Sequence, residues 1–191
     1  MGRKRGSVLR RPVLYTVAVL LALGGGATAV FLRGSAQRRD DRAAIAAYER
    51  AVYPIVKEGG RVVQEEMKPS LRQFVEGEIA AAELLRRAGS WRRAFETVRS
   101  DVLAMQPPAF LRAIEPRWTR AFDAYLQTIA AFEAAARAPA SERGARLDQV
   151  STAGTTADHL YDQAVELIRS HRRRLGLGPS PNFPEPVPGS S

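Results

Sequence analysis

The sequence predicts an all-helical protein: an N-terminal transmembrane helix, then an up-down-up-down four-helix bundle and a disordered proline-rich tail. Residues 13–32 form a run of twenty residues without a charge. Beyond this run, no stretch alternates apolar and polar residues with the period of a strand. Prolines at 69, 107, 139 and 179 instead separate segments rich in alanine, leucine, arginine and glutamate, which are good helix formers.

The composition excludes several kinds of site. The chain has 191 residues, no cysteine and two histidines, so disulfides, thiolate metal ligands and cysteine nucleophiles are excluded. Its 29 basic and 20 acidic residues give a net charge of +9. Residues 1–12 hold five of the cations and no acid, which leaves 24 basic against 20 acidic residues, or +4, beyond them. Much of the excess therefore marks the flank of a membrane span, and no nucleic-acid partner is expected.

Residues 13–32 have the length of a membrane-spanning helix. At about 1.5 Å per residue they reach across the roughly 30 Å hydrocarbon layer of a bilayer. The basic flank at residues 1–12 precedes them directly. A cleaved secretory signal is the alternative, because the Ala-Thr-Ala sequence ending at Ala29 fits a small-residue cleavage site. The apolar run continues as far as Leu32, which favours an uncleaved signal anchor.

The charges around this run favour a cytoplasmic N-terminus and an extracytoplasmic bundle. The positive-inside rule compares the lysines and arginines on the two sides of a span. Five lie before the run and four lie after it, namely Arg33, Arg38, Arg39 and Arg42. Together with the short cationic N-terminus, this small difference predicts a single-pass protein of the cell membrane. The alternative is a bundle on the cytoplasmic side that binds anionic lipid or nucleic acid.

Residues 33–175 are expected to form the bundle, with helices at 36–67, 70–106, 110–138 and 141–175. In the last helix, apolar and small residues recur at alternate spacings of three and four from Leu147 to Leu175. This heptad pattern predicts coiled-coil-like packing, in which the helix axes cross at about 20°. Short connections between long helices require antiparallel neighbours. Gly89-Ser90 is a candidate break in the second helix, and residues 176–191, rich in proline, glycine and serine, are expected to be disordered.

No motif predicts catalysis, and no cofactor is expected. Asp158, Asp162 and Glu166 recur every four residues on the last helix, beside His159, and carboxylates at this spacing could hold a metal ion. Carboxylate sites in bundles usually take ligands from several helices, including a Glu-x-x-His pair that this sequence lacks. A solvated acidic stripe is the preferred interpretation, and a metal or redox bundle enzyme is one alternative.

A run of small and hydroxylated residues at 151–157 predicts a gap in the packing of neighbouring helices against the middle of the last helix. Gly154 and Ala157 fall on the heptad seam, and the surrounding residues are poor helix formers. One interpretation is a small-ligand pocket between helices, and the other is tight packing against a bulky partner such as Trp118. The candidate pocket residues are Ser151, Gly154, Thr155 and Ala157.

Basic residues are expected to gather at the end of the bundle that lies next to the membrane. In an up-down-up-down bundle the fourth helix ends beside the start of the first. A surface for anionic headgroups is therefore predicted from Arg33, Arg38, Arg39, Arg42, Phe110, Leu111, Arg169, Arg172, Arg173 and Arg174, with Phe110 and Leu111 as exposed apolar side chains. The alternative is that the arginines of the last helix complement its C-terminal dipole.

The expected function is that of a non-catalytic, single-pass membrane protein that presents a helical bundle for protein or membrane-surface interaction. A protein partner is expected, and the sequence does not define the oligomeric state. In general shape the architecture resembles the extracytoplasmic four-helix sensor modules of bacterial receptors, although no shared motif supports this. A ligand-binding bundle, anchored or secreted, is therefore the first alternative function.

Overall fold

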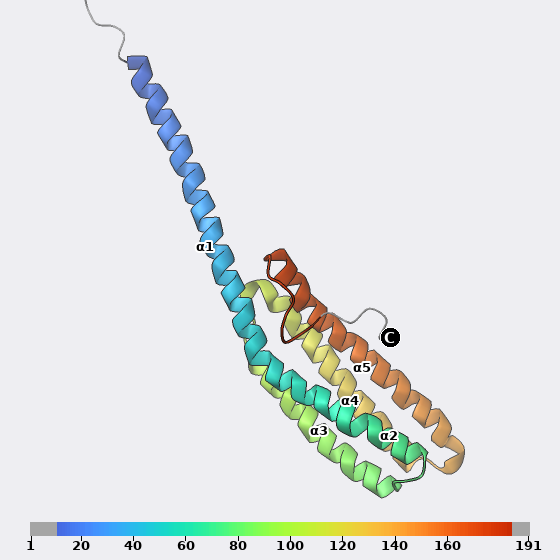
Figure 1. The fold of residues 1–191 in the computed structure, drawn as a ribbon. Coiled ribbons are helices and arrows are strands. Elements are labelled where there is room, and N and C mark those ends of the chain that lie inside the picture. The colour runs from blue at the N-terminus through green and yellow to red at the C-terminus, as the bar shows by residue number, and fades with distance from the viewer. Residues whose placement is uncertain (1–10, 185–191) are drawn as a thin grey trace, which may run out of the picture. The chain divides into compact units, whose positions relative to one another are not determined.

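The computed structural model describes the backbone of residues 11–184 and the side chains of residues 36–184. The described chain is helical and contains no strand. It divides into two compact units, Met1–Asp41 and Arg42–Ser191. The helices, shown in Figure 1, are α1 (Arg11–Arg61), η1 (Val62–Met67), α2 (Lys68–Val75), α3 (Ala81–Ala104), η2 (Ala109–Ile114), α4 (Glu115–Arg137) and α5 (Ala140–Arg174).

The first unit contains the N-terminal part of α1. Its described side chains, residues 36–41, are mostly exposed, and Gln37 Nε2 donates a hydrogen bond of 2.9 Å to Asp41 Oδ1. The predicted span at 13–32 falls within α1, but its side chains lie outside the described residues. Among the described residues, no helix is both long enough and apolar enough to cross a membrane. The transmembrane helix therefore stays a prediction.

The second unit is a bundle of four helical rods that run in alternating directions (Figure 1). The first rod consists of residues 42–61 of α1 followed by η1 and α2, and we use the term "first rod" for residues 42–75. The other three rods are α3, α4 and α5. The predicted all-helical bundle is thus confirmed for the described residues.

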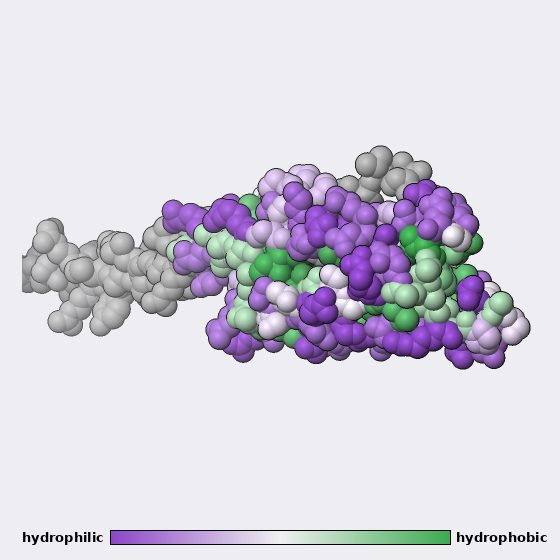
Figure 2. Space-filling model, turned by 90° about the horizontal axis from the view of Figure 1, so that it is seen from below, coloured by the Kyte–Doolittle hydropathy of each residue, from purple (hydrophilic) through white to green (hydrophobic). Residues whose placement is uncertain are grey.

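Large apolar side chains fill the core. Trp91 and Phe95 of α3 and Trp118 and Phe122 of α4 are each 1% exposed. The seam of α5 is confirmed at its buried positions, which are Val150, Ala157, Ala164 and Ile168. On the face in Figure 2, hydrophilic residues form bands, and apolar residues show between them.

The first turn of the bundle lies at residues 76–80, and its prediction at Pro69 was wrong. Pro69 sits in the first turn of α2, where proline is tolerated, directly after the wider π-helical turns of η1, and the helical rod continues past it. Glycine ends the rod instead. Gly77 has φ +77°, and the amide of Glu78 donates to the carbonyl oxygen of Gln73 at 2.8 Å, which closes a Schellman motif.

The candidate break at Gly89-Ser90 was also wrong, because α3 continues from Ala81 to Ala104. Glycine in a helix costs only about 1 kcal/mol relative to alanine. The neighbouring residues Ala88 and Trp91 are buried, so their packing outweighs this local preference. Pro54 likewise lies inside α1 without ending it.

The prediction of disorder from Gly176 onward was wrong for residues 176–184, which pack against the bundle. Gly176, at φ +66°, ends α5 in a second Schellman motif and reverses the chain. Phe183 is then 4% exposed and meets the ring of Tyr53 edge-on, at 5.6 Å between centroids. A buried aromatic side chain thus helps to anchor a segment whose composition alone is typical of disorder. Residues 185–191 lie outside the described residues.

Candidate functional site

The first rod and α5 border a groove that contains two adjoining cavities, each of about 300 Å³. The cavities share three lining residues, Val63, Tyr125 and Asp158. We call them the hydroxyl cavity and the acidic cavity after the side chains that distinguish them. A volume of this size is at the lower end of small-molecule sites in proteins.

The hydroxyl cavity contains three of the four residues predicted to line a pocket. Ser151, Gly154 and Thr155 line it, together with Thr128 of α4. The fourth, Ala157, is fully buried and lies outside this lining. Apolar side chains complete the walls, namely Val63, Met67, Leu71, Phe132 and Val150.

Local hydrogen bonds explain how such a run of threonines stays helical. Thr155 Oγ1 donates to the carbonyl oxygen of Ser151 at 3.0 Å, and Thr128 Oγ1 donates to that of Ala124 at 2.9 Å. The methyl group of Thr128 consequently faces Gly154, 3.8 Å from where a Cβ of residue 154 would lie. A Cβ at residue 154 would therefore meet Thr128 at ordinary van der Waals distance, so Gly154 borders the cavity without a close approach of backbones. Trp118, the bulky partner considered from the sequence, packs instead against Phe122 and Tyr161.

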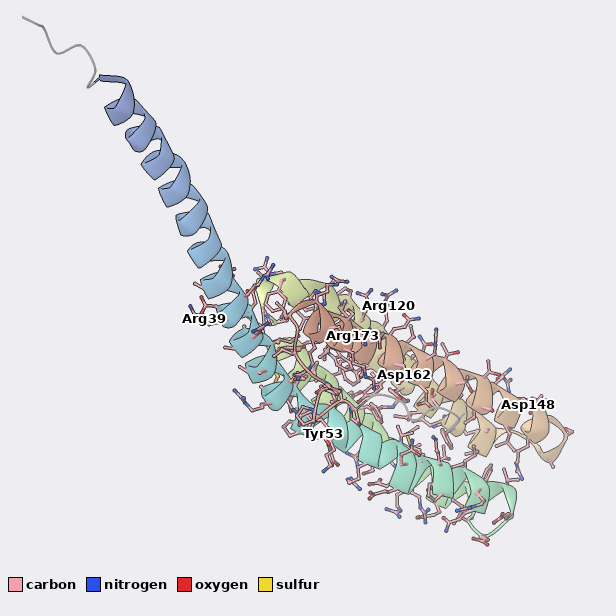
Figure 3. The ribbon with its side chains drawn as sticks, turned by 45° about the horizontal axis from the view of Figure 1, so that its top comes forward. Arg39, Tyr53, Arg120, Asp148, Asp162 and Arg173 are labelled. Carbon is pink, nitrogen blue, oxygen red and sulfur yellow. The ribbon has the colours of Figure 1, made fainter. Side chains whose placement is uncertain are left out.

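The acidic cavity has aromatic walls and two carboxylates. Its aromatic residues are Phe95, Phe122, Tyr125 and Tyr161, and its carboxylates belong to Asp158 and Asp162. No lysine, arginine or histidine lines it. Figure 3 shows Asp162 on α5 and Tyr53 on the first rod.

Asp158 lines both cavities and has one hydrogen bond and one ion pair. Tyr125 donates its hydroxyl proton to Asp158 Oδ1 at 2.7 Å, and Lys68 Nζ lies 3.9 Å from Asp158 Oδ2. Burial, and then the charge of Asp158, raise the pKa of Tyr125 well above its usual value. Burial is also the main reason that the pKa of Tyr161 rises to about 12. Both phenols therefore stay protonated at neutral pH and are available as neutral hydrogen-bonding groups.

The structure brings part of the predicted basic surface together at one end of the bundle. Arg42 Nε donates to the carbonyl oxygen of Leu175 at 2.7 Å, which places the start of the first rod beside the end of α5. Phe110 of η2 stacks on His171 at 5.8 Å between ring centroids and is half-buried. Arg38 and Arg39 are exposed and belong to the other unit, and the side chain of Arg33 lies outside the described residues.

Other members of that surface were assigned wrongly as exposed contacts. Leu111 is fully buried, because the η2 turn points it into the core. Arg172 is 9% exposed and turns inward. Arg169 donates to the carbonyl oxygens of Phe183 and Pro184, so it binds the C-terminal segment. Arg173 pairs with Glu166 but is exposed as predicted, and so is Arg174.

A buried ion pair beneath this surface was missed from the sequence. Arg172 Nη1 donates to Glu49 Oε2 at 2.6 Å, and Arg172 also donates to the carbonyl oxygens of Gly178 and Pro179. Ser180 Oγ in turn accepts hydrogen bonds from the amides of Asn182 and Phe183, which shapes the segment above the pair. The only signal in the sequence was that Glu49 stands directly after the seam residue Tyr48.

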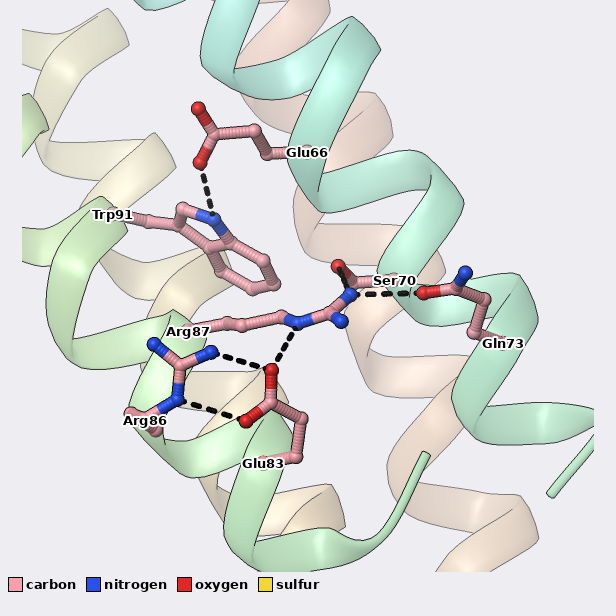
Figure 4. A network of polar contacts seen from close by, with 7 residues as sticks. All are labelled: Glu66, Ser70, Gln73, Glu83, Arg86, Arg87 and Trp91. Carbon is pink, nitrogen blue, oxygen red and sulfur yellow. Dashed lines mark hydrogen bonds and ion pairs between the residues drawn. The ribbon is translucent and has the colours of Figure 1, made fainter. Parts of the chain in front are cut away.

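A polar network joins the first rod to α3 on another side of the bundle (Figure 4). Arg87 donates to Glu83 at 2.7 Å, to Ser70 at 2.9 Å and to Gln73 at 2.8 Å. Nearby, Trp91 Nε1 donates to Glu66 at 3.0 Å. These groups satisfy one another, so we assign the network to the stability of the bundle.

Within residues 36–184 no three histidine, aspartate or glutamate side chains come together in a way that could hold a metal ion. Comparison with known protein families, with curated proteins and with solved structures found no match to this chain. The fold and the groove together define a helical bundle with a small-molecule-sized cleft between its first and last rods.

Proposed function

We propose that this chain is a non-catalytic, single-pass membrane protein whose extracytoplasmic bundle binds a small ligand in the groove between the first rod and α5. The observation that carries the proposal is the pair of adjoining cavities lined by Ser151, Gly154, Thr155 and Asp158. Of the functions considered from the sequence, the cavity favours the ligand-binding alternative, because tight packing would have filled the space at Gly154.

The lining suits a ligand better than it suits a packing defect. Protein interiors are close-packed, and voids larger than a few water molecules are uncommon. Here a mostly apolar cleft carries a few convergent polar groups, which is the usual composition of a binding site. These groups come from three different rods: Lys68 from the first, Thr128 from α4, and Ser151 and Asp158 from α5.

A cavity-filling substitution tests this proposal on the full chain purified in detergent. Gly154→Phe has room at its Cβ, and its ring would occupy the hydroxyl cavity. A small-molecule library is screened by thermal shift, and compounds that raise Tm for the wild type should fail with Gly154→Phe. Thr152→Phe is the matched control, because Thr152 is exposed on the same helix and lines neither cavity. A library without a stabilising compound, or compounds that stabilise Gly154→Phe equally, would contradict the proposal.

The anchor and its orientation need a separate experiment. Reporter enzymes that are active on only one side of the membrane are fused after Ser191 and, separately, at residue 12. We expect the periplasmic or extracellular reporter to be active at the C-terminal fusion, and the chain to resist extraction by alkaline carbonate. Activity of a cytoplasmic reporter at the C-terminus would reverse the orientation, and carbonate extraction would remove the anchor.

Contact between the bundle and a membrane surface is a second candidate function. Arg42, Arg112 and Arg174 are exposed at the end of the bundle where Phe110 is half-buried. Cations near an anionic surface contribute about 1 kcal/mol each. In nanodiscs, η2 and the end of α5 should exchange amide hydrogens more slowly with anionic than with neutral lipid. Equal exchange in both lipids would remove this candidate.

A further inference from the structure

We infer that the ligand of the groove is a small organic ammonium ion, held by its charged head in the acidic cavity, and this inference rests on the proposed function. The acidic cavity combines features that each favour a cation. Among the described residues, the charged side chains that line it are Asp158 and Asp162, while Lys68 of the adjoining cavity lies 3.9 Å from Asp158 Oδ2, so Asp162 carries the negative charge that is not already paired. Four aromatic residues also line the cavity, namely Phe95, Phe122, Tyr125 and Tyr161.

The two aspartates differ in the partners that their carboxylates already have. Asp158 accepts the hydroxyl of Tyr125 at 2.7 Å and faces the ammonium of Lys68 at 3.9 Å. Asp162 is exposed, lines the cavity one helical turn further along, and forms no hydrogen bond or ion pair with any other described residue. An ammonium head would form a charge-assisted hydrogen bond with its carboxylate.

The aromatic rings add a second attraction for a cation. The faces of aromatic rings carry negative potential, and a cation within about 6 Å of a ring centroid is attracted to it, most strongly where water is excluded. Phe95 and Phe122 are each 1% exposed, and Tyr125 is 7% exposed, so their rings border the cavity deep in the bundle. Phe95 and Tyr125 stack on each other at 4.9 Å between centroids, which holds their orientation.

The adjoining hydroxyl cavity provides room for an uncharged chain. It shares Asp158 with the acidic cavity, and its walls include Met67, Leu71 and Phe132. A head bound between the two aspartates could therefore extend an aliphatic or aromatic group along α5 toward Gly154. Alcohols fit the same volume, but they would leave the carboxylate of Asp162 without a cationic partner. Anions would meet two like charges.

A series of ligands with one chain and three head groups tests the inference. Butylammonium, butan-1-ol and butanoate are titrated against the full chain in detergent, and binding is followed by saturation-transfer NMR. Butylammonium should bind at least tenfold more tightly than butan-1-ol, and butanoate should not bind measurably. Asp162→Asn and Asp158→Asn should each weaken butylammonium at least tenfold and leave butan-1-ol within a factor of two.

Asp148→Asn is the matched control, because Asp148 is exposed on the same helix and lines neither cavity (Figure 3). It should leave the affinity for butylammonium unchanged. Equal binding of butylammonium and butan-1-ol, with both lost in Gly154→Phe, would overturn the ammonium inference and leave the groove as a ligand site. Tighter binding of butanoate would also overturn the inference. Failure of every ligand to bind the wild type would count against the ammonium ligand and the proposed function together.

Discussion

Arg172 and Glu49 form a buried ion pair of 2.6 Å, although 123 positions of the chain separate them. The side chain of Glu49 is 2% exposed and that of Arg172 is 11% exposed. Burial raises the pKa of Glu49, and the charge of Arg172 opposes this rise. One oxygen of Glu49, Oε1, has no hydrogen-bond partner among the described residues, while Arg172 and the nearby Ser180 both favour the charged form of the carboxylate.

Removing one charge of this pair should destabilise the bundle strongly. Arg172→Met would leave a buried carboxylate without its partner, and we expect a loss of about 3–5 kcal/mol in the free energy of unfolding. The double variant Glu49→Leu/Arg172→Met removes both charges and should recover most of the loss. Urea denaturation of the full chain in detergent measures each value.

The control for this comparison is Glu58→Ala, which breaks an exposed ion pair with Arg61. Exposed pairs contribute little, so we expect a change below about 1 kcal/mol. If Arg172→Met were as stable as the double variant, or more stable, the two charges would not depend on each other.

Phe183→Ala should release the C-terminal segment from the bundle. The ring is 4% exposed and packs on Tyr53, so its truncation should cost about 3 kcal/mol of docking energy. Amide hydrogen exchange should become faster across residues 177–183. Pro181→Ala, at an exposed position of the same segment, should leave the exchange unchanged. Unchanged protection in Phe183→Ala would mean that the hydrogen bonds from Arg169 and Arg172 hold the segment by themselves.

The stability of the chain should fall in acid partly through Glu83. Hydrogen bonds from Arg86 and Arg87 lower the pKa of Glu83 to about 2. Since the unfolded state binds this proton at a pKa of about 4.3, the contribution of Glu83 is complete above that pH and disappears as the pH falls toward about 2. The urea midpoint of Glu83→Gln should therefore change less between about pH 5 and pH 2 than that of the wild type. Glu78→Gln, at an exposed site, should follow the wild type.

Two glycines should respond in opposite directions to alanine. Gly89 lies inside α3, and a Cβ there would have only the tip of Arg93 near it, at 3.9 Å. Gly89→Ala should stabilise the chain by about 0.5–1 kcal/mol through helix propensity. Gly77 has φ +77°, so Gly77→Ala should destabilise it by about 1 kcal/mol. Thermal unfolding of both variants checks the signs, and stabilisation by Gly77→Ala would contradict the Schellman turn.

The helical bundle could be predicted because heptad spacing records burial directly. The large residues of α4 that follow this spacing, Trp118, Phe122, Tyr125, Ile129 and Phe132, are all buried. The placement of the first turn could not be predicted in the same way. Pro69 is compatible with the first turn of a helix, and only the π-helical turns before it make that position available. A local pattern gives no sign of such a widened turn.

The groove was predictable only in part. Small residues on a seam indicate a gap, and Gly154 indeed borders one. The acidic cavity brings together Phe95, Tyr125 and Asp162 from three rods, and no spacing along the chain connects them. The ion pair of Arg172 was hidden for a related reason, since a run of arginines at a helix end usually indicates a solvated surface. Arg172 is the member of this run that turns inward, toward Glu49, which lies far away in the sequence.

The docking of Phe183 also determines when the bundle can be completed during synthesis. Arg172, Ser180 and Phe183 follow all four rods or close the last one, yet they contact Glu49 and Tyr53 near the beginning of the bundle. The first rod therefore gains these contacts only after α5 and the segment behind it have been synthesised. The helices can form earlier, whereas the closure between the first and last rods has to come last.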